Sequence, residues 1–200
     1  MKQEFEKIWE LALPFQDKRD DDGHAKIVTE YASKLCEIEN ADDRIAVPAA
    51  ILHDIGWSKL SKEERFVIFD QNIAPELERK IRINHQQEGV RLAKKILQKA
   101  GYPPALVRLI LEIVSQHDTR QNFFSKEDGA MRDGDKLWRF SKIGFSADLR
   151  RTKLAFDILY DRMLNKIDEK NFFFFESARI MAREEMENRK KEFEKHAFLS

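Results

Sequence analysis

The sequence has few of the residues that mark specialised classes of protein. It contains one cysteine, Cys36, which excludes an intramolecular disulfide framework and any multi-cysteine zinc or iron–sulfur site and is typical of a reducing compartment. Only 7 glycines and 5 prolines occur in 200 residues, which argues against a fibrous or disordered chain. The 36 basic and 36 acidic side chains cancel, so the net charge offers no strong reason to expect binding to nucleic acid or to an anionic membrane.

Long apolar runs are also lacking. No stretch is long enough to span a bilayer, and the N-terminal "MKQEFEKIWELALPF" carries acidic residues where a signal peptide needs a basic and then an apolar block. We therefore expect a soluble, cytoplasmic protein. The hydrophobic fraction of 42%, with 15 phenylalanines, suffices for a substantial core, and the length fits one domain or a domain with an appended helical piece.

Apolar residues recur at helical spacing along almost the whole chain, which predicts an all-α fold. "RFVIFD" at 65–70 is the one short candidate strand. We expect the final helix to be an outer packing helix or an oligomer contact, as in a homodimer. The predicted helices are 25–39, one from a cap at Asp42 or Asp43 to a stop at Gly56, Asn84 to Gly101, 104–117, one around 137–140, 147–166 and 176–197.

The stretch "ILHDIGW" places His53 and Asp54 side by side in a mostly apolar segment, where polar groups are costly to bury unless something pairs with them. A hydrogen-bonded His-Asp pair would satisfy that need locally, and a metal ion would satisfy it functionally. Three further histidines and a late aspartate suit the second explanation, because imidazole nitrogens and carboxylate oxygens bind divalent transition metals. These residues are His24, His85, His117 and Asp135.

The ordered set of His24, the doublet His53-Asp54 and Asp135 resembles the HD-domain superfamily of metal-dependent phosphohydrolases, which has an all-helical fold. The resemblance extends over about 17–140. It implies a single HD-type domain over 1–200, a helical bundle with a metal-binding core at about 17–145 and additional C-terminal helices at about 146–200.

The late motif "RDGDKLWRF" is similar to the family's usual Asp-Ala-Asp-Arg/Lys-Leu pattern. This similarity selects Asp135 as the ligand and leaves Asp133 as the alternative. Gly134 replaces the more usual alanine, a change between small residues that we expect to be harmless.

Family members with a dinuclear centre have two more histidines between the doublet and the last aspartate, and His85 and His117 stand at those places. The resemblance then implies that Asp54 bridges two ions, one of them completed by His85 and His117. In mononuclear members these histidines line the pocket and contact substrate instead. The implied cofactor is one or two divalent transition metal ions: Mn, Fe, Ni, Co or Zn.

The resemblance implies hydrolysis of a nucleotide or other small phosphorylated molecule through metal-activated water, with Asp54 among the catalytic residues. Asp118 either protonates the leaving group, orients a ligand, or is a cap or surface carboxylate. Four cations near the motifs are candidates for binding substrate phosphate, although each also fits a solvated surface charge: Arg19, Lys59, Arg120 and Lys136.

Trp57 is a departure from the family, because many members have lysine at this place in "HDIGK". Lys59 is a candidate substitute, and Trp57 then belongs to a pocket wall or to the core. Two other functions stay open at this stage. Diiron oxygenases of the same superfamily, which use dioxygen on small polar substrates, carry the same ordered ligands, and a nucleotide-binding regulatory module is the third alternative.

Overall fold

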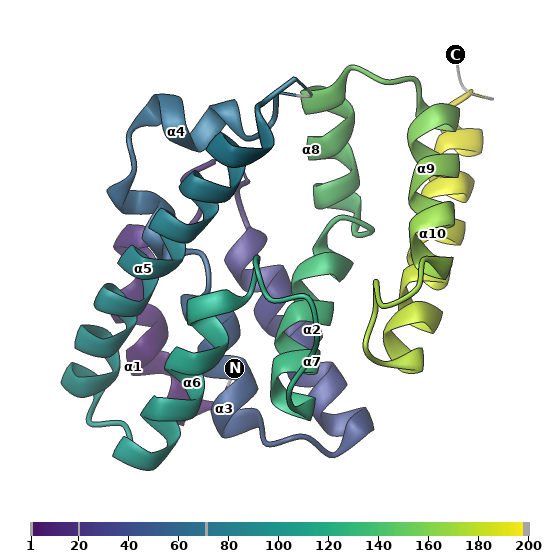
Figure 1. Ribbon diagram of the computed structural model, residues 1–200. Coiled ribbons are helices and arrows are strands. Elements are labelled where there is room, and N and C mark those ends of the chain that lie inside the picture. Colours follow the sequence, from purple (N-terminus) through teal and green to yellow (C-terminus); the bar gives the residue numbers. More distant parts are fainter. Residues whose placement is uncertain (1, 20, 71, 198–200) are drawn as a thin grey trace.

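The computed structural model describes residues 2–19, 21–70 and 72–197. Within these ranges every regular element is a helix, so the predicted all-α class is confirmed (Figure 1). The helices are α1 (Gln3–Ala12), α2 (His24–Glu39), α3 (Asp43–Leu52), α4 (Lys62–Val67), α5 (Pro75–Ala100), α6 (Pro104–Gln116), α7 (Lys126–Trp138), α8 (Lys142–Thr152), α9 (Phe156–Asp168) and α10 (Glu176–Ala197), with short 3-10 helices η1 (Leu13–Phe15) and η2 (Ile55–Lys59).

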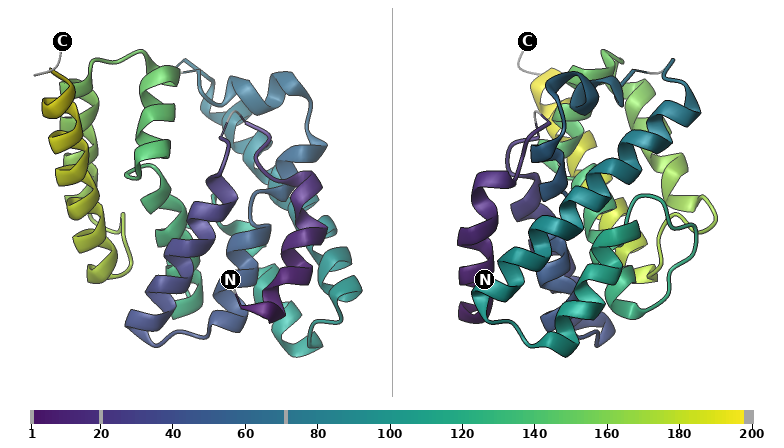
Figure 2. Two further views of the ribbon diagram at one scale, coloured as in Figure 1. Left: turned by 180° about the vertical axis from the view of Figure 1, so that it is seen from behind. Right: turned by 60° about the vertical axis from the view of Figure 1, so that its left-hand side comes forward.

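Most helices pack around two large apolar cores that share α2 and α7, and a third, small cluster joins Trp57, Leu60 and Ile81. The first core joins α1, α3, α5 and α6 to these two helices. The second joins them to α8, α9 and α10, which lie at the opposite end of the molecule from α5 and α6 (Figures 1 and 2). The additional C-terminal helices thus continue the bundle through a core of their own.

Several predicted helix boundaries are confirmed. The last helix covers 176–197 and α6 ends at Gln116, one residue before His117. The Asp42 side chain caps α3 by accepting from the backbone N–H of Arg44 at 3.0 Å. Gly101 ends α5 with a left-handed φ of 74°, a conformation that glycine adopts without steric cost.

Other boundaries were wrong. The helix predicted from Asn84 begins at Pro75, because a proline at the first helical position starts α5 earlier and places Asn84 in its interior. The helix predicted over 147–166 is two helices, α8 and α9, separated after Lys153, which adopts a left-handed φ of 54°. The candidate strand at 65–70 is the end of α4 and a turn.

The doublet segment also differs from expectation. Helix α3 ends at Leu52, before the histidine, and Gly56 is not its stop. Gly56 lies inside η2, where a Cβ atom would come within 1.9 Å of the His85 carbonyl oxygen. Glycine is therefore required here for the close approach of η2 to α5.

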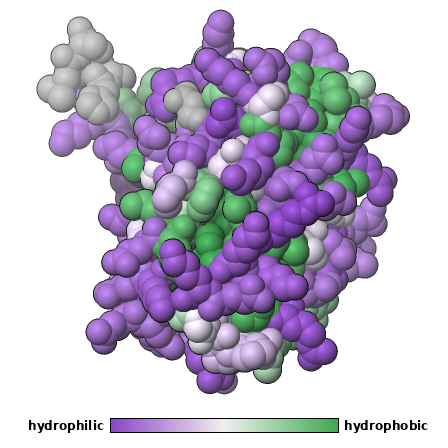
Figure 3. Space-filling model, turned by 90° about the vertical axis from the view of Figure 1, so that its left-hand side faces the viewer, coloured by the Kyte–Doolittle hydropathy of each residue, from purple (hydrophilic) through white to green (hydrophobic). Residues whose placement is uncertain are grey.

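The left-hand face of Figure 1 is mostly hydrophilic, with apolar side chains gathered near its middle and upper right (Figure 3). No helix in the described part of the chain is both long enough and apolar enough to cross a membrane. The predicted cytoplasmic location and homodimer stay predictions.

Candidate metal centre

Helix ends carry four of the six predicted ligands into the middle of the bundle. His24 is the first residue of α2, after Gly23, whose φ is 81°. His53 is the C-terminal cap of α3, and Asp54 follows it at the start of η2. His117 is the corresponding cap of α6. The two remaining ligands lie within helices, His85 in α5 and Asp135 in α7.

The first group of ligand atoms comes from His24, His53 and Asp135. The two histidine Nε2 atoms lie 3.1 Å apart, and Asp135 Oδ1 lies 3.4 Å from that of His24 and 3.6 Å from that of His53. Asp54 Oδ2 joins this group at 3.4 Å and 3.6 Å from the same two nitrogens. Three helix ends and one helix interior thus converge on one point.

The second group comes from His85, His117 and Asp54. Its histidine Nε2 atoms lie 3.3 Å apart, and the other Asp54 oxygen, Oδ1, lies 3.7 Å from His85 and 3.4 Å from His117. Asp118 adds a carboxylate oxygen 3.4 Å from His85 Nε2 and 3.9 Å from His117 Nε2. Each Asp54 oxygen therefore faces a different pair of histidines.

These separations fit metal coordination. Ligand atoms about 2.1 Å from a common ion at tetrahedral angles lie roughly 3.4 Å apart, close to the spacing in both groups. The Nδ1 atoms of His53 and His117 lie 2.8 Å and 3.0 Å from the carbonyl oxygens of Ala50 and Val114. An Nδ1–H donor to each carbonyl leaves the Nε2 lone pair facing the cluster, which is the tautomer that a metal requires.

The carboxylates of the centre are held in their ionised form. Burial raises the pKa of Asp54, but the Arg19 guanidinium and His53 outweigh it and hold the pKa well below its usual range. Burial likewise opposes ionisation of Asp118, whose pKa is nevertheless lowered by His117, His85 and Arg82. A dense group of anionic oxygens in the protein interior attracts cations.

The histidines differ among themselves. Burial lowers the pKa of His53, yet the nearby Asp54 and Asp135 raise it to about 9. For His85 burial dominates and lowers the pKa to about 3, so its ring is neutral at pH 7. Without a metal, a proton on His53 partly balances the carboxylates, and that proton must leave before the nitrogen can bind an ion.

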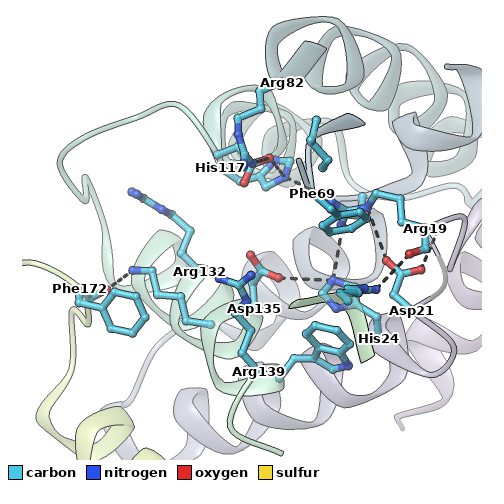
Figure 4. Close-up of a pocket in the computed structure, with 16 residues that line it drawn as sticks. Arg19, Asp21, His24, Phe69, Arg82, His117, Arg132, Asp135, Arg139 and Phe172 are labelled. Carbon is cyan, nitrogen blue, oxygen red and sulfur yellow. Dashed lines mark hydrogen bonds and ion pairs between the residues drawn. The ribbon is translucent and has the colours of Figure 1, made fainter. Parts of the chain in front are cut away.

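A pocket of about 290 Å³ opens onto the centre (Figure 4). Of the four predicted substrate-binding cations, Arg19 and Lys136 line it, whereas Lys59 and Arg120 are not among its described lining residues. Arg19 is engaged with Asp54 and Asp21. The Lys136 ammonium donates to the Phe172 carbonyl and lies 3.8 Å from Asp133 Oδ1. Lys59 lies over the Phe15 ring instead.

Arg120 pairs with Glu112 and lies over the ring of Phe124. A substrate role for these cations stays a prediction. The pocket has four further cations that were not predicted from the sequence, although two of them belong to the late motif "RDGDKLWRF" and one precedes His85 by a single helical turn. These are Arg132 and Arg139 in the motif, Arg82 before His85, and Arg151.

Asp133, the alternative ligand, has a structural role away from the cluster of ligand atoms. It is fully buried, and its carboxylate accepts backbone N–H groups of Phe174 and Phe175 at 3.0 Å and 2.9 Å. Gly134 faces α2, where a Cβ atom would lie 3.0 Å from the backbone of Val28 and Ala32. The glycine thus permits a closer α2–α7 contact than the alanine usual at this position.

Comparisons with known proteins agree with this architecture. Residues 22–137 match the family model described as HD domain. A crystal structure of a predicted HD superfamily hydrolase from an uncultured Thermotogales bacterium superposes with a TM-score of 0.60 at 19% identity, over 96% of this chain and 90% of that one. A search of curated proteins found no match.

Proposed function

We propose that this chain, which belongs to the HD-domain family, is a metal-dependent phosphohydrolase acting on a small phosphorylated molecule such as a nucleotide. The observation that carries the proposal is the arrangement of two histidine pairs on either side of one carboxylate, Asp54, at the floor of a pocket with cationic walls. Divalent ions held there would lower the pKa of a water ligand toward neutrality and offset charge on phosphoryl oxygens.

The protein's own groups would bind and orient the substrate. Arg82 and Arg139 line the pocket, and their guanidinium groups suit phosphate oxygens, which they can contact with two parallel hydrogen bonds. Asp118 lies between the second histidine pair and Arg82, 3.0 Å from the guanidinium. Its lowered pKa suits an acceptor that takes a proton or orients water more than an acid that protonates a leaving group.

The pocket wall favours hydrolysis of a phosphoester over the oxygenase alternative. Both reactions use the same ordered ligands, so the ligands do not separate them. Six cationic side chains line the pocket against four carboxylates, all four of which lie at or beside the centre. A wall of this charge suits an anionic substrate better than an uncharged polar one.

The test is purification without oxygen, metal analysis, and then a panel of phosphoesters assayed with and without oxygen. We expect metal-dependent release of phosphate at the same rate in both conditions. Two bound irons with oxygen consumption and no phosphate release would favour the oxygenase. Nucleotide binding without any turnover in the metal-loaded protein would instead favour the regulatory module.

A further inference from the structure

We infer that Trp57 is a positioning residue for the second group of ligands: its indole N–H fixes one oxygen of Asp54, and its ring fixes the imidazole of His85. The inference rests on the proposed pair of metal ions. It assigns a role to the residue that stands where many family members have lysine, and this role differs from that of a simple core or pocket-wall residue.

The hydrogen bond distinguishes the two oxygens of Asp54. Trp57 Nε1 donates to Asp54 Oδ1 at 3.0 Å, and Oδ1 is the oxygen that faces His85 and His117. The other oxygen, Oδ2, accepts from Arg19. A carboxylate held by one donor at each oxygen cannot rotate to give both oxygens to one ion, so it is oriented to bridge two.

The ring contact holds a histidine whose Nδ1 atom is not anchored by a hydrogen bond. His85 is fully buried and its Nδ1 atom has no hydrogen-bond partner in the described structure, unlike the Nδ1 atoms of His53 and His117. The Trp57 ring stacks on His85 with centroids 4.0 Å apart and planes 11° from parallel. Stacking therefore orients the ring of His85, as a hydrogen bond to a backbone carbonyl orients the rings of His53 and His117.

The indole is also suited to this place by its charge. An indole N–H is a neutral donor that does not titrate. A lysine here would bring a second positive charge next to the ion that His85 and His117 would hold. Trp57 orients the carboxylate without adding to the repulsion, and Arg19, 4.4 Å above its ring, already places a cation against Asp54.

Trp138 provides a matched control. It is buried like Trp57, and its ring contacts His24 of the first ligand group edge to face, at 4.8 Å and 80°. Its Nε1 atom has no acceptor in the described structure. A change of Trp138 to phenylalanine thus removes the same atoms beside the centre without removing a hydrogen bond to a ligand.

The experiment titrates metal-free protein with Mn²⁺ by calorimetry and records the electron paramagnetic resonance of the loaded protein. We expect Trp57→Phe to weaken one of two binding events roughly 10- to 100-fold, as loss of a partner behind a ligand typically does, and to reduce the coupled-pair signal. Trp138→Phe should leave the affinity for the ion of the second group, which His85 and His117 would hold, at the wild-type value.

A third protein carries 3-benzothienylalanine at position 57, which keeps the shape of the ring and the stacking but lacks the N–H. We expect this protein also to bind one ion more weakly, and the result tests the role of the N–H even if Trp57→Phe does not fold. Unchanged affinities in this protein, equal weakening by both phenylalanine variants, or a wild type that binds one ion would each overturn the inference. Loss of an ion without any phosphoesterase activity in the wild type would overturn the proposed function and leave this inference standing.

Discussion

Gly56 and Gly89 face each other where η2 meets α5, and they offer opposite predictions for the same substitution. At Gly56 a Cβ atom would lie 1.9 Å from the carbonyl oxygen of His85 and 2.5 Å from the backbone nitrogen of Gly89. At Gly89 it would lie no closer than 3.5 Å to any atom, with Val114 as its nearest neighbour. The Cβ atom at position 56 would clash with backbone atoms of α5, whereas the Cβ atom at position 89 would make an ordinary van der Waals contact.

The magnitudes follow from these distances. Alanine at position 56 must move η2 away from α5, because neither clashing atom belongs to a flexible side chain, and such overpacking costs typically about 1–3 kcal/mol. Alanine at position 89 fills available space within a long helix. Glycine is about 0.8–1.0 kcal/mol less favourable than alanine inside a helix, so this substitution should stabilise the fold by about that amount. For a chain of this length, 1 kcal/mol changes Tm by roughly 2–4 °C.

Urea unfolding and thermal melting of both variants measure the effect, and metal analysis reports on the site. We expect Gly56→Ala to lower Tm by roughly 2–12 °C and to lose metal, because the same displacement moves Asp54 away from His85. Gly89→Ala should raise Tm by roughly 2–4 °C and retain its metal. A Gly56→Ala protein as stable as the wild type would show that η2 does not approach α5 as closely as the structure has it.

Three further outcomes are expected. Metal analysis should find that Asp54→Ala loses both ions while staying helical by circular dichroism, whereas His53→Ala and His85→Ala each lose one; a full metal content in the Asp54 variant would refute the ligand assignment. Cys36 is buried, and burial raises the pKa of its thiol to about 12, so a thiol reagent should label it only as the protein unfolds; rapid labelling under native conditions would contradict this. Asp133→Ala leaves two backbone N–H groups without their acceptor and should cost about 2 kcal/mol or more in urea unfolding, an effect that a near-neutral result would exclude.

Much of the fold could be predicted from local pattern, and the errors have local causes. The periodicity at 176–197 and the Gly101 stop are strong signals because each depends on few neighbours. The long helix expected over 147–166 failed because Lys153 adopts a left-handed φ that has no sequence signature in a residue other than glycine or asparagine. The start of α5 at Pro75 was missed because the capping pattern at Asn84 competed with it.

The candidate site also has a part that could be predicted from the sequence, the ligands, and a part that largely could not, the pocket walls. The six proposed ligands could be named because their order and neighbours resemble a family, and the structure brings all six together. The walls of the pocket could be named only in part, because Arg19 and Lys136 line it but its other cations were not predicted. Arg151 reaches the pocket from α8, where it shares Asp148 with Arg139, and nothing in the sequence around Arg151 marks it as a neighbour of the centre.

The doublet shows what the order of ligands in the sequence leaves open, namely the direction in which each side chain points. Adjacent residues of a continuous helix point about 100° apart, so a helix that continued through the doublet would direct His53 and Asp54 to different places. The chain resolves this by ending α3 at Leu52 and turning into η2, a turn that brings Asp54 Oδ2 within 3.6 Å of His53 Nε2. The turn needs Gly56 to pass close to α5, and the same passage sets Trp57 against His85. The apolar residues around the doublet therefore serve the candidate metal centre because α3 ends at Leu52, before the doublet, whereas the sequence pattern predicts a helix that stops only at Gly56.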